Sequence, residues 1–113
     1  MIKLIVSDID GTLVNNEKEV PVSFWKAFER MQELDILFCV ASGRQIQSLH
    51  ELFAPIKNNI AYAPDNGASL IYQNKTLFEK LITPADYLPI MRTCNEINGI
   101  GVALCGRDRA YIK

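Results

Sequence analysis

Two aspartates, Asp8 and Asp10, follow an apolar run near the start of the chain and are separated by one residue. Residues i and i+2 of an extended segment point to the same side, so we expect the two carboxylates to share one small space. Without a partner they would repel each other, and at least one would have a raised pKa. A divalent cation or a shared proton would remove the repulsion, and Mg²⁺ suits a site that offers one or two carboxylates.

The residues after the aspartates could bring backbone donors close to an anion. Gly11 permits a sharp turn whose N–H groups can approach a phosphate, and Thr12 adds a hydroxyl. The same Asp-x-Asp-Gly pattern also occurs in ordinary turns and in calcium-binding loops. A calcium loop is disfavoured because its later ligand positions fall on Val14 and Glu19. An ordinary turn stays open as the alternative for this segment taken alone.

A second polar cluster, Ser42-Gly43-Arg44, ends another apolar run and comes directly before a helical pattern. A hydroxyl, a glycine and a cation at the start of a helix can bind an anion. Taken alone, Ser42 is more often a helix N-cap. Because the carboxyl ends of parallel strands share one edge of a sheet, we expect Ser42 beside Asp8, and that neighbourhood favours phosphate binding.

These clusters must be positioned by an alternation of strands and helices. Apolar runs predict buried strands at residues 2–7, 36–41 and 60–63, and helical spacing predicts helices at 23–34 and 45–53. The first run is apolar at nearly every position, which is typical of a strand covered on both faces. Short connections between such elements require right-handed crossovers and a parallel sheet. The sequence therefore predicts an open α/β sheet with its ligand site at the carboxyl ends of the strands.

The pattern changes after Pro64. Asn66-Gly67 is a strong turn signal, and Thr83-Pro84 is typical of a helix start. Apolar periodicity predicts a hairpin at 69–72 and 76–81, a helix from 84 to 98, and a second hairpin at 101–105 and 109–112.

The overall charge is nearly balanced. The 12 basic and 13 acidic residues give a net charge of −1, which argues against nucleic acid or an anionic membrane as a partner. No apolar run reaches the roughly 18 residues of a membrane span, and we expect no signal peptide and a cytoplasmic protein. Cys39, Cys94 and Cys105 are expected to be reduced thiols in core positions, with zinc ligation as the alternative. His50 is expected on the surface.

Three stretches together resemble a known family. Residues 8–13, Asp-Ile-Asp-Gly-Thr-Leu, resemble the first motif of the haloacid dehalogenase (HAD) superfamily, and residues 41–44, Ala-Ser-Gly-Arg, resemble its second motif in the Cof-type sugar-phosphatase branch. Residues 65–68, Asp-Asn-Gly-Ala, resemble a Glu-Asn-Gly-Ala stretch of that branch, with Asp65 where glutamate is usual. The resemblance implies an α/β fold, a HAD-like Rossmannoid parallel sheet flanked by helices. Residues 1–81 would be the incomplete core domain, and residues 82–113 the beginning of an α/β cap of the C2 type.

The resemblance also implies a phosphatase that acts on a small phosphorylated metabolite, such as a sugar phosphate. Asp8 would be the nucleophile that forms an aspartyl-phosphate, and Asp10 the general acid and then the general base. Mg²⁺ would be held by Asp8 and by the main-chain carbonyl of Asp10. The implied phosphate-binding residues are Gly11, Ser42 and Gly43, and the implied substrate-orienting residues are Thr12, Arg44 and Asn66. Arg44 could equally form a local ion pair, and Asn66 could equally serve turn geometry.

In that family a lysine and further acids complete the site after the cap, and this chain stops at Lys113 before either. We therefore expect the N-terminal portion of a longer phosphatase, which alone would have little activity and would aggregate or pair as a homodimer. Three alternatives stay open. They are a phosphosugar mutase of the same superfamily, a catalytically incomplete binding or assembly fragment, and a receiver domain, which Asp65 favours and the first two motifs oppose.

Overall fold

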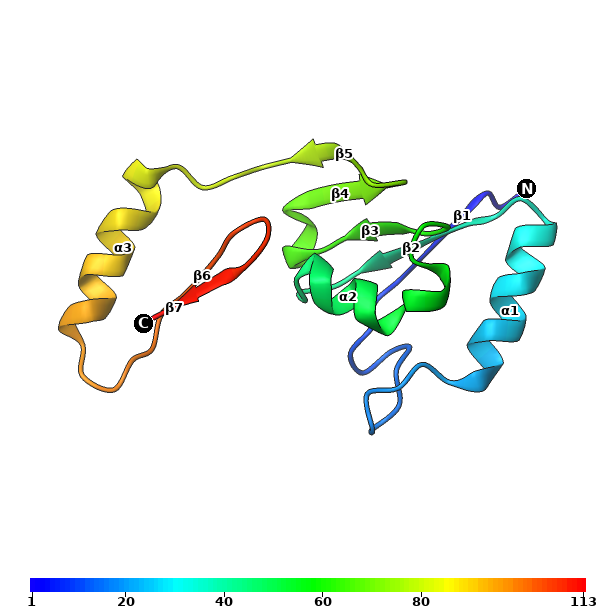
Figure 1. Cartoon of the computed structure of the whole chain (residues 1–113), viewed down its shortest axis with the longest axis horizontal. Helices are drawn as coiled ribbons and strands as arrows, with labels where there is room; N and C mark the ends of the chain where they lie inside the picture. Colours follow the sequence, from blue (N-terminus) through cyan, green and yellow to red (C-terminus); the bar gives the residue numbers. More distant parts are fainter. The chain divides into compact units, whose positions relative to one another are not determined.

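The computed structural model describes residues 1–113 as two compact units, Met1–Glu79 and Lys80–Lys113. The first unit contains a five-stranded sheet and two α-helices, and the second contains one α-helix and a two-stranded hairpin (Figure 1). The division falls between Glu79 and Lys80, two residues before the boundary between core and cap that the family resemblance implies.

Three parallel strands begin the sheet of the first unit, which confirms the α/β prediction. Across the sheet the order is β1 (Leu4–Ser7), β2 (Leu37–Ala41), β3 (Ala61–Ala63), β4 (Ser69–Tyr72) and β5 (Lys75–Glu79). The pairs β1–β2 and β2–β3 are parallel, whereas β3–β4 and β4–β5 are antiparallel. The hairpin predicted after Pro64 therefore joins the same sheet and makes it mixed. Its turn consists of Gln73 and Asn74, whose φ angles of 49° and 60° are those of a type I′ hairpin turn.

Both helices of the first unit contribute to one hydrophobic core. α1 (Val22–Glu33) supplies Phe24 and Phe28, and α2 (Ile46–Leu52) supplies Leu49. They pack against every second residue of the strands, because alternate residues of a strand point to the same face. The strand residues in contact with this core are Ile5, Phe38, Val40, Tyr62 and Ile71. The Phe24 ring centroid lies 5.0 Å from that of Phe38, so aromatic packing ties α1 to the strand that leads to the second motif.

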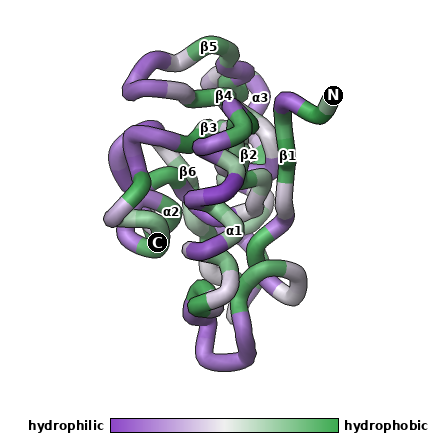
Figure 2. The backbone as a smooth tube through the Cα atoms, turned by 90° about the vertical axis from the view of Figure 1, so that its right-hand side faces the viewer, coloured by the Kyte–Doolittle hydropathy of each residue, from purple (hydrophilic) through white to green (hydrophobic).

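β1 is an edge strand that pairs only with β2. Its Ile5 faces the core, while Leu4 and Val6 point to the opposite face and are 53% and 54% exposed. Figure 2 shows the hydrophobic residues along this strand. The prediction of a strand covered on both faces is therefore wrong for these residues, because both helices pack on the face that contains Ile5.

Two predictions about single side chains also need correction. His50 is expected on the surface, but it is half-buried in α2. Its ring centroid lies 4.9 Å from that of Tyr62 in an edge-to-face contact. Burial lowers the pKa of His50. Among the cysteines only Cys39 is buried, with its pKa raised by burial, whereas Cys94 is half-buried and Cys105 is exposed. All three are free thiols.

The second unit begins with α3 (Pro84–Glu96). The Asp86 carboxylate accepts hydrogen bonds from the Thr83 hydroxyl at 2.7 Å and from the Thr83 N–H at 3.3 Å, which satisfies donors at the helix start. The hairpin of β6 (Ala103–Cys105) and β7 (Ala110–Ile112) follows, shorter than predicted. None of the helices in the chain combines the length and the hydrophobicity needed to cross a membrane.

Candidate active site

The first motif forms a tight turn directly after β1. Ile9 is fully buried between Asp8 and Asp10, which are both exposed, so the turn is anchored in the core and presents two carboxylates to solvent. The Ile9 carbonyl accepts three backbone hydrogen bonds, of 3.3, 3.0 and 3.1 Å, from the N–H groups of Thr12, Leu13 and Val14. Gly11 has a φ of +79°, a left-handed conformation that glycine adopts without steric cost.

The carboxylate of Asp8 has a hydroxyl as its partner. Thr12 Oγ1 donates a hydrogen bond of 2.8 Å to Asp8 Oδ2. Thr12, which the family resemblance implies as a substrate-orienting residue, is in contact with Asp8 in the structure. The contact fixes one carboxylate oxygen and leaves the other, Oδ1, for a ligand or a reaction.

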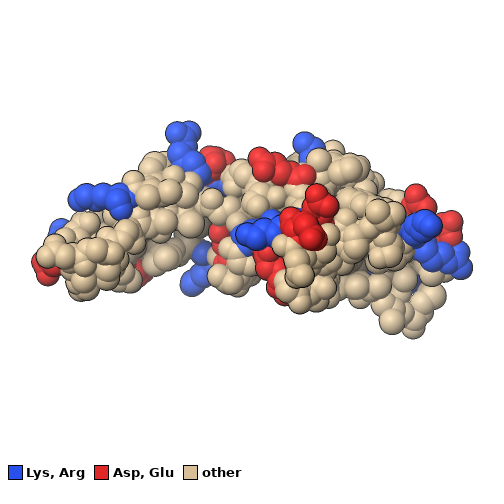
Figure 3. All heavy atoms as spheres, turned by 90° about the horizontal axis from the view of Figure 1, so that it is seen from below, with Lys and Arg blue, Asp and Glu red and all other residues tan.

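The carboxylate of Asp10 has a guanidinium as its partner. Arg44 Nε donates to Asp10 Oδ2 at 2.8 Å, and Arg44 Nη2 donates to Asp10 Oδ1 at 2.6 Å. The hydrogen bond from Arg44 is the main reason that the pKa of Asp10 is lowered, and the charge of Lys18 adds to the effect. Arg44 thus supplies a positive charge beside Asp10, whereas the sequence predicts a divalent cation or a shared proton as the partner of the two carboxylates. Figure 3 shows basic and acidic side chains close together on the face that it displays.

The second motif follows β2, and hydrogen bonds within the motif and to β3 fix its backbone. Ser42 is 7% exposed, and its Oγ accepts the N–H of Arg44 at 3.1 Å. The N–H of Ser42 donates to the carbonyl of Ala63 at 3.1 Å, which continues the pairing of β2 with β3. A Cβ added to Gly43 would lie 3.0 Å from Asn66 Oδ1, so the Asn66 side chain occupies the space beside this glycine. α2 begins only at Ile46, with Gln45 as its N-cap, so Ser42 is not the N-cap of this helix.

The third stretch forms the short helical turn η2 (Asp65–Gly67) after β3. Its three consecutive residues have positive φ angles of 50°, 57° and 83°. A left-handed conformation costs a non-glycine residue roughly 1–2 kcal/mol, although Asp and Asn tolerate it best. The N–H of Asp65 donates to the Arg44 carbonyl and the N–H of Asn66 to the Ser42 carbonyl, both at 3.0 Å. This turn is therefore tied to the second motif, and partial burial raises the pKa of Asp65.

The predicted site residues fall into two contact groups. The first group is Asp8 with Thr12. The second group contains Asp10, Ser42, Gly43, Arg44 and Asn66. The sequence does not identify Lys18 as a residue that acts on Asp10. Nothing in the polar segment of residues 15–19 indicates which carboxylate its charge lies near.

Two residues of the first motif could contribute oxygen ligands to a divalent cation. The Asp8 carboxylate is exposed and has no cationic partner, so it fits a hard cation that prefers oxygen ligands. The Asp10 carboxylate is already paired with Arg44, so this residue fits the cation only through its main-chain carbonyl. Nowhere in residues 1–113 do three or more His, Cys, Asp or Glu side chains form a group that could hold a metal ion. The residues present therefore fit an Mg²⁺ ion that takes its other ligands from water and phosphate.

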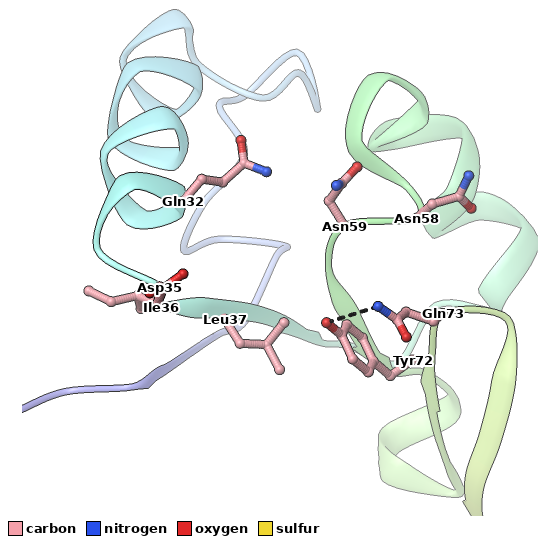
Figure 4. Close-up of a pocket in the computed structure, with 8 residues that line it drawn as sticks. All are labelled: Gln32, Asp35, Ile36, Leu37, Asn58, Asn59, Tyr72 and Gln73. Atoms are coloured by element: carbon pink, nitrogen blue, oxygen red, sulfur yellow. Dashed lines mark hydrogen bonds between the residues drawn. The ribbon is translucent and has the colours of Figure 1, made fainter.

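A cavity of about 310 Å³ lies elsewhere in the first unit (Figure 4). Its lining comes from the end of α1, the start of β2 and the residues between them, from the segment before β3, and from the end of β4 with the turn that follows. Four carboxamides line it, those of Gln32, Asn58, Asn59 and Gln73, with Asp35 as the single carboxylate. It offers no pair of acidic groups, so the candidate site is the opposite end of the strands, where Asp8 and Asp10 lie.

The chain is similar to known proteins over nearly its whole length. The family model of the haloacid dehalogenase-like hydrolases matches residues 5–113. Among curated proteins, the chain is 29% identical over 111 residues to the 5-amino-6-(5-phospho-D-ribitylamino)uracil phosphatase YbjI of Escherichia coli (strain K12). That alignment covers 97% of this chain and 41% of the relative, so the chain spans about two-fifths of the relative's length.

Solved structures share the fold of the chain. SMU.1108c from Streptococcus mutans UA159 matches with a TM-score of 0.88 and 30% identity, over 99% of this chain and 43% of the other. BT4131, described as a HAD subclass IIB sugar phosphatase, matches with a TM-score of 0.78 and 27% identity, over 97% of this chain and 43% of the other.

Proposed function

The chain belongs to the haloacid dehalogenase-like hydrolases, and on that premise we propose that it carries the nucleophile and the acid–base residue of a phosphomonoester hydrolase. One observation carries the proposal: two exposed carboxylates flank the buried Ile9, and each has a different partner. Asp8 accepts a hydrogen bond from a hydroxyl, whereas Asp10 is paired with a guanidinium. Two carboxylates in different surroundings can take different roles in one reaction.

In the first step, Asp8 acts as the nucleophile. Its free carboxylate oxygen attacks the phosphorus atom, and the bond between phosphorus and the leaving oxygen breaks. The hydrogen bond from Thr12 holds the other oxygen of Asp8 in place during the attack. Asp10 donates a proton to the leaving oxygen, so the products are an alcohol and an aspartyl-phosphate.

In the second step, water attacks the aspartyl-phosphate. Asp10 accepts a proton from the water as general base. The bond between phosphorus and the Asp8 oxygen breaks, which releases phosphate and restores the Asp8 carboxylate. The pairing with Arg44 favours the ionised form of Asp10, which is the form that this step requires. The first step requires the protonated form, which the negative charge of a phosphate bound near Asp10 would favour.

Phosphate and metal would bind at the two motif loops. Mg²⁺ bound by the Asp8 carboxylate and the Asp10 carbonyl would offset the repulsion between the anionic nucleophile and the anionic substrate. The hydroxyl of Ser42 and the N–H groups of Gly11 and Gly43 would hold the non-bridging phosphate oxygens.

We propose that the substrate is a small phosphorylated metabolite with a sugar or sugar-derived chain. YbjI is named for a phosphorylated ribityl compound, and BT4131 is described as a sugar phosphatase. Both descriptions support a phosphate carried by a polyhydroxylated chain.

The substitution Asp8→Asn in the full-length protein tests the proposal. The amide has nearly the same shape but is not a nucleophile, so phosphate release should fall to background while circular dichroism stays unchanged. Asp35→Asn is the matched control, because Asp35 is exposed and lies in the connection between α1 and β2. Activity above a few per cent of wild type in Asp8→Asn would overturn the role of Asp8. If the phosphate reappears on another carbon of the same sugar, the reaction is that of a mutase and not hydrolysis.

A further inference from the structure

A continuous series of contacts leads from the turn of residues 65–67 to the carboxylate of Asp10. The turn hydrogen-bonds the backbone of Ser42 and Arg44, and the Arg44 side chain then pairs with Asp10. The family comparison does not assign a role to this series.

We propose that the left-handed turn of Asp65, Asn66 and Gly67 sets the direction of the Arg44 side chain and thereby the position of the Asp10 carboxylate. Arg44 and Asn66 are then positioning residues, and neither has to touch the substrate. The proposal rests on the proposed function, because it concerns the residue that exchanges the proton there.

The first link in the series is made by the backbone. The carbonyl of Arg44 accepts the N–H of Asp65, and the carbonyl of Ser42 accepts the N–H of Asn66, both at 3.0 Å. The N–H of Ser42 is itself bonded to Ala63 at 3.1 Å. The peptide groups on both sides of Gly43 and Arg44 are thus fixed by the segment that follows β3, which leaves the Arg44 backbone little freedom.

The second link is made by side chains. Asn66 Oδ1 occupies the space in which a Cβ of residue 43 would lie, at 3.0 Å, so glycine at this position allows the turn to approach the second motif. The planar fork of Arg44 then bonds both oxygens of Asp10. A two-pronged contact of this kind fixes the orientation of a carboxylate as well as its distance.

The strain of the turn is not required by the hairpin in which it lies. A connection of about five residues between antiparallel strands is usually built around a type I turn, which needs no run of left-handed residues. Here three consecutive residues are left-handed, and two of them are not glycine. Such strain persists where the surrounding structure imposes it, and it is concentrated at functional sites. The contacts with the second motif supply that structure.

A test that does not depend on activity follows the Arg44 Nε–H proton by NMR in the full-length protein. In the wild type this proton should exchange slowly with water, because it is bonded to Asp10 at 2.8 Å. Asn66→Val opposes the left-handed backbone and should accelerate the exchange at least several-fold. Asn74→Val is the matched control, since Asn74 is also left-handed, with φ 60°, but lies in the hairpin turn between β4 and β5. If Asn66→Val does not fold, Asn66→Ala, which lacks the β-branch, takes its place.

A second test compares substrates with poor and good leaving groups. Alkyl phosphates need a proton donor more than aryl phosphates do, so a displaced Asp10 should lower kcat/KM for alkyl substrates more. We expect Arg44→Gln and Asn66→Val to lower the alkyl-to-aryl ratio of kcat/KM about tenfold or more. The ratio in Arg44→Lys should lie between those of the wild type and Arg44→Gln, because lysine keeps the charge but cannot form the two-pronged contact. Arg30→Gln is the control, because Arg30 pairs with Glu33 on the exposed face of α1.

The outcomes separate this proposal from the proposed function. An active wild type whose alkyl-to-aryl ratio is unchanged in Arg44→Gln would overturn the positioning role alone. Unchanged Nε–H exchange in Asn66→Val would overturn the role of the turn. A wild type that hydrolyses no phosphate ester would overturn the proposed function, while the exchange measurement would still decide whether the turn holds Arg44 on Asp10.

Discussion

Arg44 and Asp10, 34 positions apart in the sequence, form an ion pair in which two nitrogens of the guanidinium bond both oxygens of the carboxylate, at 2.8 and 2.6 Å. The pair explains how two nearby aspartates can both stand exposed at the end of one strand. Its side chains are 22% and 51% exposed, so water and salt screen the attraction. We therefore expect the pair to matter for the position and charge of Asp10 more than for stability.

The substitution Asp10→Asn should leave the nucleophile intact but remove the group that exchanges the proton. Hydrolysis of alkyl phosphates should fall roughly 10²–10⁴-fold, the usual contribution of general acid–base catalysis. The loss should be smaller for aryl phosphates, whose leaving groups need little protonation. Steady-state kinetics of the full-length protein on both substrate types provide the measurement, and equal losses would count against a general-acid role.

Removal of divalent cations should abolish phosphate release without unfolding the protein. The proposed ligands lie on an exposed turn, whereas the core of the first unit contains aromatic and aliphatic side chains that need no metal. Treatment with a chelator should therefore reduce activity to background, and added Mg²⁺ should restore it, with little change in the melting temperature. Activity that survives complete chelation would exclude a role for the cation, and a large loss of thermal stability would indicate a structural metal.

Alkaline pH should destabilise the fold through Tyr62. Burial raises the pKa of this phenol to about 12, from an ordinary value near 10. Below pH 10 the phenol of Tyr62 is protonated in both the folded and the unfolded state, and its contribution to stability is complete. Between pH 10 and 12 the phenol loses its proton only in the unfolded state. The free energy of unfolding should therefore fall by about 1 kcal/mol per pH unit from this group.

Denaturant unfolding at pH 9 to 11.5 measures this dependence in the wild type and in Tyr62→Phe. The variant should lose the slope contributed by Tyr62, together with about 1 kcal/mol for the hydrogen bond of 3.0 Å to the Lys57 carbonyl. Tyr111→Phe, at an exposed position, should leave the slope as it is. Equal slopes in the wild type and Tyr62→Phe would show that the phenol does not control the alkaline transition.

A polypeptide limited to these 113 residues should self-associate through β1. Leu4 and Val6 lie next to each other on the same face of this edge strand and are more than half exposed, a combination that favours pairing with another chain. Sedimentation at micromolar concentration with Mg²⁺ should show dimers or larger species, and replacement of both residues by threonine should reduce them. Val22→Thr is the control, because Val22 is 75% exposed on α1. A compact wild-type monomer would contradict the prediction.

The sequence by itself determined the elements and their order. Apolar runs and helical periodicity predicted β1, α1, β2, α2 and β3 within about two residues at most ends, because buried residues of strands and helices recur with different periods. The same patterns predicted both hairpins, and Thr83-Pro84 predicted the start of α3. The rule for parallel sheets predicted that the residues after β1 and β2 lie at the same edge of the sheet, and these two strands are parallel.

Only the tertiary structure decided which side chains meet at that edge. The sequence could not pair Arg44 with Asp10 or bring Asn66 against Gly43, because these contacts join loops that follow three different strands. It could not show that Asp65 and Asn66 are left-handed, since the signal Asn-Gly predicts a turn but not its conformation. It also could not show that His50 packs on Tyr62. Local patterns fix the backbone of each element, but contacts between loops depend on how far the strands and helices shift against one another when the core packs.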